Sequence, residues 1–168
     1  CEQNPGVRLL CVDAWQPYAG YRDHVSGEKL ESFYVETQAK LAPYPRTTII
    51  RKFSLEAAKD IEDGSLDFVF LDANHSLPNV IADLAAWTPK VRAGGIVAGH
   101  DFARHRWPNQ MHVVQAVQAW TDAYDIHPWF LLGLKEKVDG VLRDDARSWF
   151  WVHQPRPVWR KGQKVIQQ

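Results

Sequence analysis

Apolar strands that end abruptly on polar residues constrain the fold of this sequence more than any other feature. The run LDFVFL, Leu66 to Leu71, stops at Asp72, and Asn74 and His75 follow at once. The other runs, with the polar residues that follow them, are Val7 to Val12 before Asp13, Thr47 to Ile50 before Ser54, and Ile96 to Ala98 before His100 and Asp101. Continuous rather than alternating apolar strands are typical of a parallel sheet covered by helices.

Segments with helical spacing separate these runs. The first predicted helix spans 28–41, and a second, short helix is capped by Ser54 and ends before Gly64. A third helix begins at Pro78 and should bury Val80, Leu84 and Trp87. A fourth spans about 111–124 and should bury Val113, Val114, Val117 and Trp120. We expect Pro89 to bend or end the third helix. Gly94 and Gly95 should separate it from the strand 96–98.

Two aromatic segments, 129–132 and 148–152, complete the pattern as an antiparallel strand pair. The predicted fold class is α/β, a Rossmann-like and mostly parallel sheet with helices on both faces and an antiparallel C-terminal strand pair. We expect one domain over residues 1–153 and an exposed basic tail over 154–168.

The composition argues against several classes of partner. Lys and Arg number 20, as do Asp and Glu, so the formal net charge is zero and no general field attracts nucleic acid or an anionic membrane. No apolar run approaches a membrane span. Cys1 and Cys11 are too few for a disulfide framework, which favours the reducing cytoplasm. We expect neither a nucleic acid nor a membrane partner, and a homo-oligomer is compatible with the sequence.

The polar residues that follow the strands should share one edge of the sheet. In open α/β sheets, ligands bind outside the carboxyl ends of the strands. Asp13 could instead cap a turn, and Ser54 could do no more than cap a helix. Convergence from two neighbouring strands makes Asp72, His75 and Asp101 the strongest candidates for a functional site.

These residues also resemble a known family. The segment DGSLDFVFLDANHSLPNVIADLAAWTPKVRAGGIVAGHDF, residues 63–102, resembles the second half of class I S-adenosylmethionine (SAM)-dependent methyltransferases. It is most similar to the group called methyltransferase family 24, which is often linked to O-methylation of sugars and glycans. The resemblance extends from about Val7 to Val152. Within it, LDFVFLDANHS and PKVRAGGIVAGHDF are specific, and the flanking strands are generic.

The resemblance implies roles for individual residues. Asp13 matches the acidic residue that accepts hydrogen bonds from the ribose hydroxyls of SAM, and Trp15 would line the adenine side. Ser54 matches a position that contacts the adenine. Asp72 matches the acidic residue that faces the methyl-transfer centre and contacts the cofactor. His75 falls where related enzymes place a catalytic base.

The resemblance leaves the use of a metal open. In related metal-dependent O-methyltransferases a divalent cation binds the carboxylate that matches Asp72, with further ligands that match His100 and Asp101. Two carboxylates suit magnesium, whereas His100 would favour manganese, iron or zinc. In a metal-free site, His75 would take the proton of the acceptor hydroxyl and Asp101 would orient it.

One element of the family pattern is absent. No glycine-rich cofactor loop precedes Val7, and the segment PYAGYRD is no substitute because it follows Asp13. Residues upstream of Cys1 could supply the corresponding strand and loop, another segment could fill their place, or the protein could bind the cofactor poorly. We expect an upstream segment.

The leading hypothesis is a SAM-dependent O-methyltransferase acting on a small hydroxylated acceptor, such as a sugar. Arg104, His105 and Trp107 would help to shape the acceptor pocket. A metal-dependent hydrolase using Asp72, His75, His100 and Asp101 is an alternative that needs no cofactor loop. A non-catalytic methyltransferase-like module is a third reading, and titration with SAM separates the first hypothesis from the other two.

Overall fold

The computed structural model describes residues 4, 6–17, 25–104, 111–133 and 146–154. Its elements in chain order are β1 (Leu9–Asp13), α1 (Gly27–Leu41), β2 (Thr47–Arg51), α2 (Ser54–Lys59), β3 (Leu66–Leu71), α3 (Leu77–Trp87), the 3₁₀ turn η1 (Thr88–Lys90), β4 (Val91–Gly99), α4 (Val113–Ala123), β5 (Trp129–Leu132) and β6 (Ser148–Val152). Of the sequence predictions, His105, Trp107 and residues 155–168 of the basic tail lie outside the described residues.

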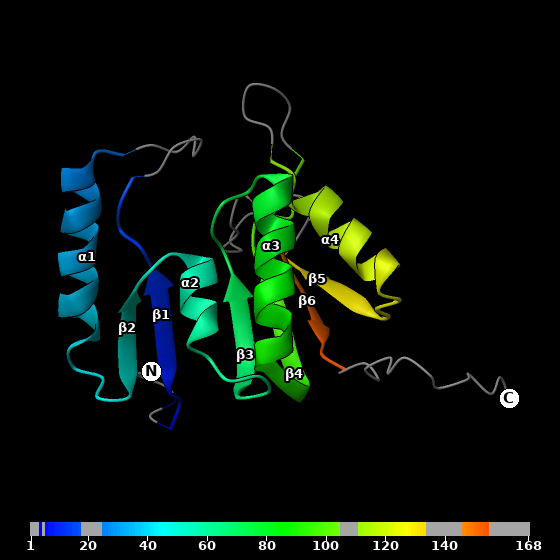
Figure 1. Cartoon of the computed structure of the whole chain (residues 1–168), viewed down its shortest axis with the longest axis horizontal. Coiled ribbons are helices and arrows are strands. Elements are labelled where there is room, and N and C mark those ends of the chain that lie inside the picture. The colour runs from blue at the N-terminus through cyan, green and yellow to red at the C-terminus, as the bar shows by residue number, and fades with distance from the viewer. Residues whose placement is uncertain (1–3, 5, 18–24, 105–110, 134–145, 155–168) are drawn as a thin grey trace, which may run out of the picture.

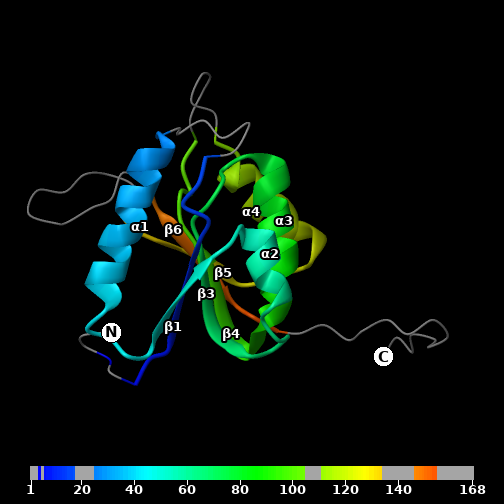
Figure 2. The same ribbon diagram turned by 60° about the vertical axis from the view of Figure 1, so that its left-hand side comes forward.

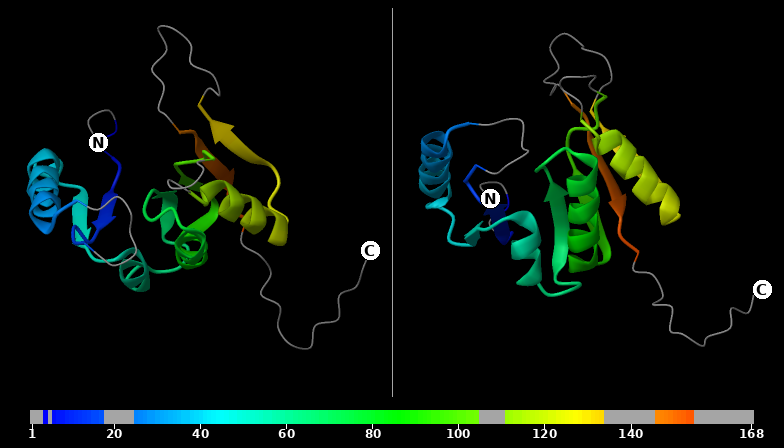
Figure 3. Two further views of the ribbon diagram at one scale, coloured as in Figure 1. Left: turned by 90° about the horizontal axis from the view of Figure 1, so that it is seen from above. Right: turned by 45° about the horizontal axis from the view of Figure 1, so that its top comes forward.

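The described strands form two sheets (Figures 1 and 3). One consists of the parallel pair β1–β2, and the other has the order β3-β4-β6-β5. In the second sheet β3 and β4 are parallel, and β6 is antiparallel to both of its neighbours. The α/β class and the antiparallel C-terminal pair are thus confirmed. The described strands β1 and β3 do not pair with each other, so the sheet is interrupted between them.

Helices lie on both sides of the strands, but unevenly. Figure 2 shows α1 on one side and α2, α3 and α4 on the other. The core lies under α3 and α4, where Leu84, Val97, Val117, Trp149 and Trp151 are at most 1% exposed. By contrast, α1 has no buried residue. Among the described residues, the four-stranded sheet is therefore packed with helices on one face only.

Strand β4 is longer than the sequence suggested. Gly94 and Gly95 were expected to precede the strand, but β4 runs through both from Val91. The N–H of Gly94, at φ 73°, donates to the carbonyl of His153 over 2.9 Å. A Cβ on Gly95 would lie 2.7 Å from the carbonyl oxygen of Asp67. Here the glycines permit a close approach of strands rather than a break.

The two central helices have the predicted inner faces. The residues expected to be buried, and found so, are Val80, Leu84 and Trp87 on α3 and Val113, Val114 and Val117 on α4. Trp120 is the exception, because it is only half-buried and packs its ring 4.3 Å from that of Tyr124. No helix in the described ranges is both long and apolar enough to cross a membrane.

Candidate active site

The carboxyl ends of β3 and β4 bring Asp72, His75 and Asp101 together, as the sequence predicted. The Nε2 atom of His75 lies 2.8 Å from Oδ2 of Asp101 and 3.7 Å from Oδ1 of Asp72. The side chains of His75 and Asp101 are 21% and 19% exposed, whereas that of Asp72 is 50% exposed. The imidazole therefore lies between a sheltered carboxylate and one that faces solvent.

Local hydrogen bonds hold His75 where the chain turns from β3 into α3. The side-chain oxygen of Asn74 accepts from the N–H of Ser76 over 2.9 Å. Ser76 then precedes the first turn of α3, in which Pro78 needs no hydrogen-bond donor. The carbonyl of His75 accepts from the N–H of His112, just before α4. The turn is thus tied to two helices.

Asp101 adopts a left-handed backbone conformation, with φ 57°. This conformation is costly for most residues, though less so for Asp, and such strain is common at functional sites. Neighbouring bonds impose it: Nε1 of Trp149 donates to the carbonyl of His100 over 3.0 Å, and the N–H of Phe102 donates to the carbonyl of Arg147 over 2.9 Å. Strand β6 and the residue before it therefore fix the direction of the Asp101 carboxylate.

The two carboxyls have opposite electrostatic environments. Hydrogen bonding to His75 lowers the pKa of Asp72 below the ordinary aspartate value. Burial raises the pKa of Asp101, although the nearby His75 partly opposes this. A carboxylate that ionises readily thus stands beside one that holds its proton more tightly, with the imidazole between them.

The same three residues could hold a metal ion. Within the described ranges, one ligand atom each from Asp72, His75 and Asp101 lies within 4.8 Å of the others. His100 was predicted as a ligand, but it is not part of this group. Its Nδ1 lies 3.6 Å from Oδ1 of Asp101. The geometry thus places His75, rather than His100, with the two carboxylates.

Asp13 and Trp15 lie at the carboxyl end of β1, in the other sheet. Oδ1 of Asp13 accepts from the N–H of Trp15 over 2.7 Å, so this carboxylate does cap a turn. Trp15, at φ 46°, is 7% exposed, and its ring lies 5.1 Å from that of Tyr34. The guanidinium of Arg51 lies over the same Tyr34 ring, 4.2 Å from its centre. The sequence does not predict this stack of Trp15, Tyr34 and Arg51, because the three residues come from separate parts of the chain.

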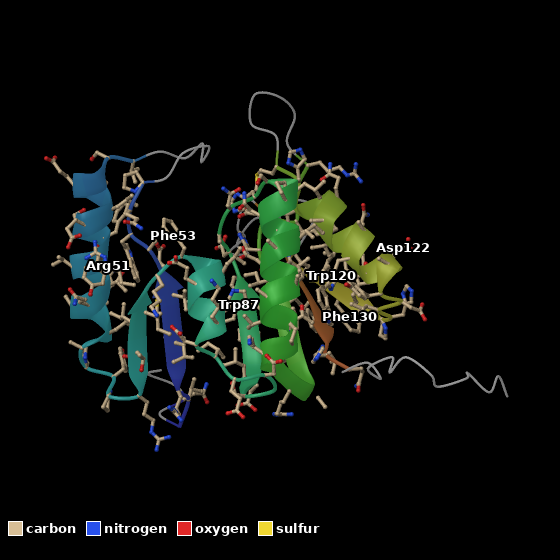
Figure 4. All side chains as sticks on the ribbon, in the orientation of Figure 1. Arg51, Phe53, Trp87, Trp120, Asp122 and Phe130 are labelled. Atoms are coloured by element: carbon tan, nitrogen blue, oxygen red, sulfur yellow. The ribbon has the colours of Figure 1, made fainter. Side chains whose placement is uncertain are left out.

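Ser54 is engaged within the protein. Its hydroxyl donates to Oδ1 of Asp83 and accepts over 2.8 Å from Nε1 of Trp87, the α3 residue that Figure 4 labels. It is the first residue of α2 rather than its cap, since Phe53 occupies the N-cap position. Asp83 was not predicted from the sequence; it is 7% exposed, and burial raises its pKa. Its position three residues after Val80 and four before Trp87, on the apolar face of α3, could have revealed it.

A small cleft joins this network to the cluster. Its lining includes Asn74, His75, Asp83, His100 and Trp149. Polar groups thus converge on a partly apolar recess at the carboxyl ends of the strands, which is where α/β sheets bind ligands.

Comparison with known proteins agrees with the fold. Residues 1–102 match the family described as "Methyltransferase domain", of type 24, and the chain belongs to that family. It is 35% identical over 96 residues to the uncharacterized protein y4gI of Sinorhizobium fredii. That match covers 56% of this chain but only 10% of the relative.

Several solved structures share the fold at low sequence identity. An rRNA methylase from Streptococcus thermophilus superposes with a TM-score of 0.57 at 7% identity, covering 90% of this chain and 78% of that one. A SAM-dependent O-methyltransferase from Thermotoga maritima gives 0.54 at 13% identity, covering 90% and 61%. A methyltransferase-like protein from Streptococcus mutans in complex with S-adenosylhomocysteine (SAH) gives 0.52 at 7% identity, covering 86% and 75%. The predicted class I methyltransferase fold is confirmed.

Proposed function

We propose that this domain carries out SAM-dependent O-methylation of a small hydroxylated acceptor, with His75 as the general base. The observation that carries the proposal is the 2.8 Å contact between Nε2 of His75 and Oδ2 of Asp101, at the carboxyl ends of two parallel strands. Membership of the methyltransferase-domain family and the shared fold support methyl transfer in general.

SAM supplies an electrophilic methyl group on a sulfonium. The residues at the end of β1 fit such a ligand, because the Asp13 carboxylate is exposed and accepts a single described hydrogen bond, to the N–H of Trp15. A carboxylate has room for about four donors, so ribose hydroxyls could still bind there. Trp15, which is 7% exposed and packs on Tyr34, would leave only a small apolar area beside it. Asp72 would face the methyl-transfer centre.

His75 would remove the proton from the acceptor hydroxyl. A neutral hydroxyl is a weak nucleophile, and an imidazole titrates close to neutral pH. The Asp101 carboxylate at 2.8 Å and the Asp72 carboxylate at 3.7 Å would stabilise the imidazolium that forms. Because Asp101 is sheltered, this attraction is weakened less by solvent than it would be at the surface.

A divalent cation such as magnesium or manganese is compatible with the same residues. Asp72, His75 and Asp101 would hold it, and it would lower the pKa of a bound hydroxyl. His75 cannot be a ligand through Nε2 and keep its contact with Asp101 unchanged. Base and ligand are therefore alternative roles that an experiment can separate.

We further propose a sugar or glycan as the acceptor, in keeping with the family resemblance. Arg104 follows Asp101 by three residues, and its guanidinium donates to the side-chain oxygen of Gln118 over 3.5 Å. This long bond between exposed groups leaves the guanidinium easy to redirect toward an acceptor hydroxyl.

The test is calorimetric titration of SAM and SAH, followed by a radiolabelled methyl-transfer assay over a panel of sugars and catechols. We expect both ligands to bind, Asp13→Ala to abolish binding, and His75→Gln to leave SAM binding intact while reducing the methyl-transfer rate by about 10²-fold or more. His127→Gln is the matched control, because His127 is exposed and far along the chain on the approach to β5.

The assay is repeated after extensive dialysis against EDTA. Unchanged activity identifies His75 as the base, whereas activity that returns only with magnesium or manganese identifies the cluster as a cation site. Absence of SAM and SAH binding would overturn the proposal. In that case a metal-dependent hydrolase or a non-catalytic module would remain.

A further inference from the structure

The imidazole of His112 lies at the start of α4 and bonds to a different helix. His112 is the N-cap residue of α4, yet within the described part of the chain its side chain makes no capping hydrogen bond to α4. Residues favoured at this position, such as Ser, Asp and Asn, use their side-chain oxygen for the first turn of their own helix. Here Nδ1 of the imidazole instead accepts from the backbone N–H of Leu77 over 3.3 Å.

Leu77 is the first residue of that other helix, α3. The first N–H groups of a helix have no partner inside it and need an acceptor from outside. Among the described residues, the N-cap Ser76 gives α3 no side-chain capping bond, and the next residue, Pro78, has no N–H to satisfy. The His112 imidazole therefore supplies the acceptor that the cap of α3 does not.

A second hydrogen bond joins the same two segments. The backbone N–H of His112 donates to the carbonyl of His75 over 2.9 Å. Together with the bond from Leu77, it holds the chain on both sides of residue 76. We call these two bonds the His112 clamp. One residue can make both because α3 and α4 begin next to each other (Figure 1).

The clamp is firmly anchored on its α4 side. Val113 and Val114, which follow His112 directly, are each 3% exposed and belong to the hydrophobic core. His112 therefore cannot move far without disturbing the core. On the α3 side, the bond from the N–H of Ser76 to Asn74 joins near neighbours. Such a local bond shapes the turn but does not fix where the turn lies in the fold.

The side chain that depends on this placement is that of His75. Its Nε2 lies 2.8 Å from Oδ2 of Asp101, which comes from the end of a different strand. Asp101 is held from the side of β6, through the bond between Trp149 and the preceding carbonyl. The contact persists only if His75 is held as well. A displacement of about 1 Å in a reacting group can lower a rate by about 10²-fold.

We propose that His112 is a positioning residue for His75: its backbone N–H and its Nδ1 hold the turn between β3 and α3, so that the His75 imidazole stays against the Asp101 carboxylate. The effect on methyl transfer rests on the proposed function, whereas the clamp itself can be tested without it. In this role His112 acts through Nδ1, and its Nε2 makes no contact with the acceptor.

Three variants separate the two ring nitrogens of His112. In His112→Asn the side-chain oxygen can take the place of Nδ1, whereas in His112→Gln it lies nearer to the place of Nε2, and His112→Ala has neither acceptor. We expect the Leu77 amide, followed by NMR, to exchange with water at least about tenfold faster in the Ala and Gln variants. Diethyl pyrocarbonate should modify His75 at least about threefold faster in the same two variants, as measured by mass spectrometry of its peptide. Both rates should return toward the wild-type values in His112→Asn.

The methyl-transfer assay measures the consequence for the reaction. His112→Ala and His112→Gln should lower kcat by about 10- to 100-fold and leave the acceptor KM and SAH binding unchanged, because a displaced base affects the transition state alone. His112→Asn should recover most of kcat. Asn79→Ala is the matched control, since it removes a 2.6 Å hydrogen bond to Ser76 in the same turn without touching the clamp. Its kcat should stay close to that of the wild type.

Three outcomes would overturn the inference. Equal Leu77 exchange and equal His75 modification in the wild type and His112→Ala would show that the clamp does not hold the turn. Activity that His112→Gln keeps and His112→Asn loses would place Nε2 against the acceptor. A loss of kcat in Asn79→Ala as large as that in His112→Ala would assign the effect to general loosening of the helix start.

Failure of the proposed function is a separate result. A wild-type protein that binds neither SAM nor SAH, or transfers no methyl group, would overturn that function. The exchange of Leu77 and the modification of His75 would then still support or refute the clamp, because neither measurement depends on activity.

Discussion

Replacing Ser54 by alanine distinguishes a structural role from a ligand-binding role for this residue. The Ser54 hydroxyl joins two buried groups, the indole of Trp87 at 5% exposure and the carboxyl of Asp83 at 7%. Ser54→Ala leaves both without this partner, and an unsatisfied buried polar group costs about 1–3 kcal/mol. Because Ser54 is only half-buried, water should replace part of the loss. We expect the free energy of unfolding to fall by about 2–4 kcal/mol.

The loss should depend on pH in a defined direction. Burial raises the pKa of Asp83, and the hydrogen bond from Ser54 opposes that rise. A carboxyl with a raised folded-state pKa contributes stability at a pH below its unfolded pKa, and this contribution disappears as the pH rises through the folded value. Ser54→Ala removes this hydrogen bond and therefore raises the pKa of Asp83 in the folded protein further. The destabilisation should therefore be larger at about pH 7 than at about pH 4.

Urea unfolding at both pH values measures the effect, and thermal unfolding should show a midpoint lowered by roughly 5–12 °C for a domain of this size. Asp83→Asn is the control, since an amide oxygen can accept from Ser54 but cannot ionise. In that background the pH dependence of Ser54→Ala should disappear. A Ser54→Ala variant of unchanged stability but weakened SAM binding would refute this reasoning and make Ser54 a cofactor contact, as the family resemblance implies.

Three other substitutions have clear expected outcomes. Gly99→Ala should lower the free energy of unfolding, measured by urea denaturation, by about 2–3 kcal/mol. The reason is that the alanine Cβ would lie 2.3 Å from a ring carbon of Trp149. Asp101→Gly should be more stable than Asp101→Ala by about 1 kcal/mol, which reverses the usual order in a regular element, because φ is 57° at this position. Thermal unfolding of the two variants compares them directly. Asp13→Asn should keep the turn bond to the N–H of Trp15 and the melting temperature, yet weaken SAM binding by about tenfold in calorimetry, whereas Asp13→Ala should lose both.

Local sequence signals predicted most of the elements. The strands 66–71, 129–132 and 148–152 match the observed ones because runs of aromatic and β-branched residues have few other uses in a domain of this size. The prediction that Gly94 and Gly95 precede the strand was wrong, because glycine occurs both in turns and where two strands approach closely. Only the register of β4 against β3 distinguishes the two cases.

The candidate site was predicted in part. The convergence of Asp72, His75 and Asp101 follows from topology alone, because adjacent parallel strands end at one edge of the sheet. The placement of His75 rather than His100 between the carboxylates depends on side-chain directions after each strand. Those directions are set by contacts that are distant in sequence, and no spacing rule reports them.

The Asp101 carboxylate illustrates why the C-terminal strands belong to the site. Beside its left-handed backbone, the carbonyl of His100 accepts from the indole N–H of Trp149, which lies 49 residues further along the chain. Trp149 is 1% exposed and fills the space that a side chain at Gly99 would need. The antiparallel pair thus does more than extend the sheet. It holds the residues just after β4, where Asp101 has its left-handed conformation and its Oδ2 lies 2.8 Å from Nε2 of His75.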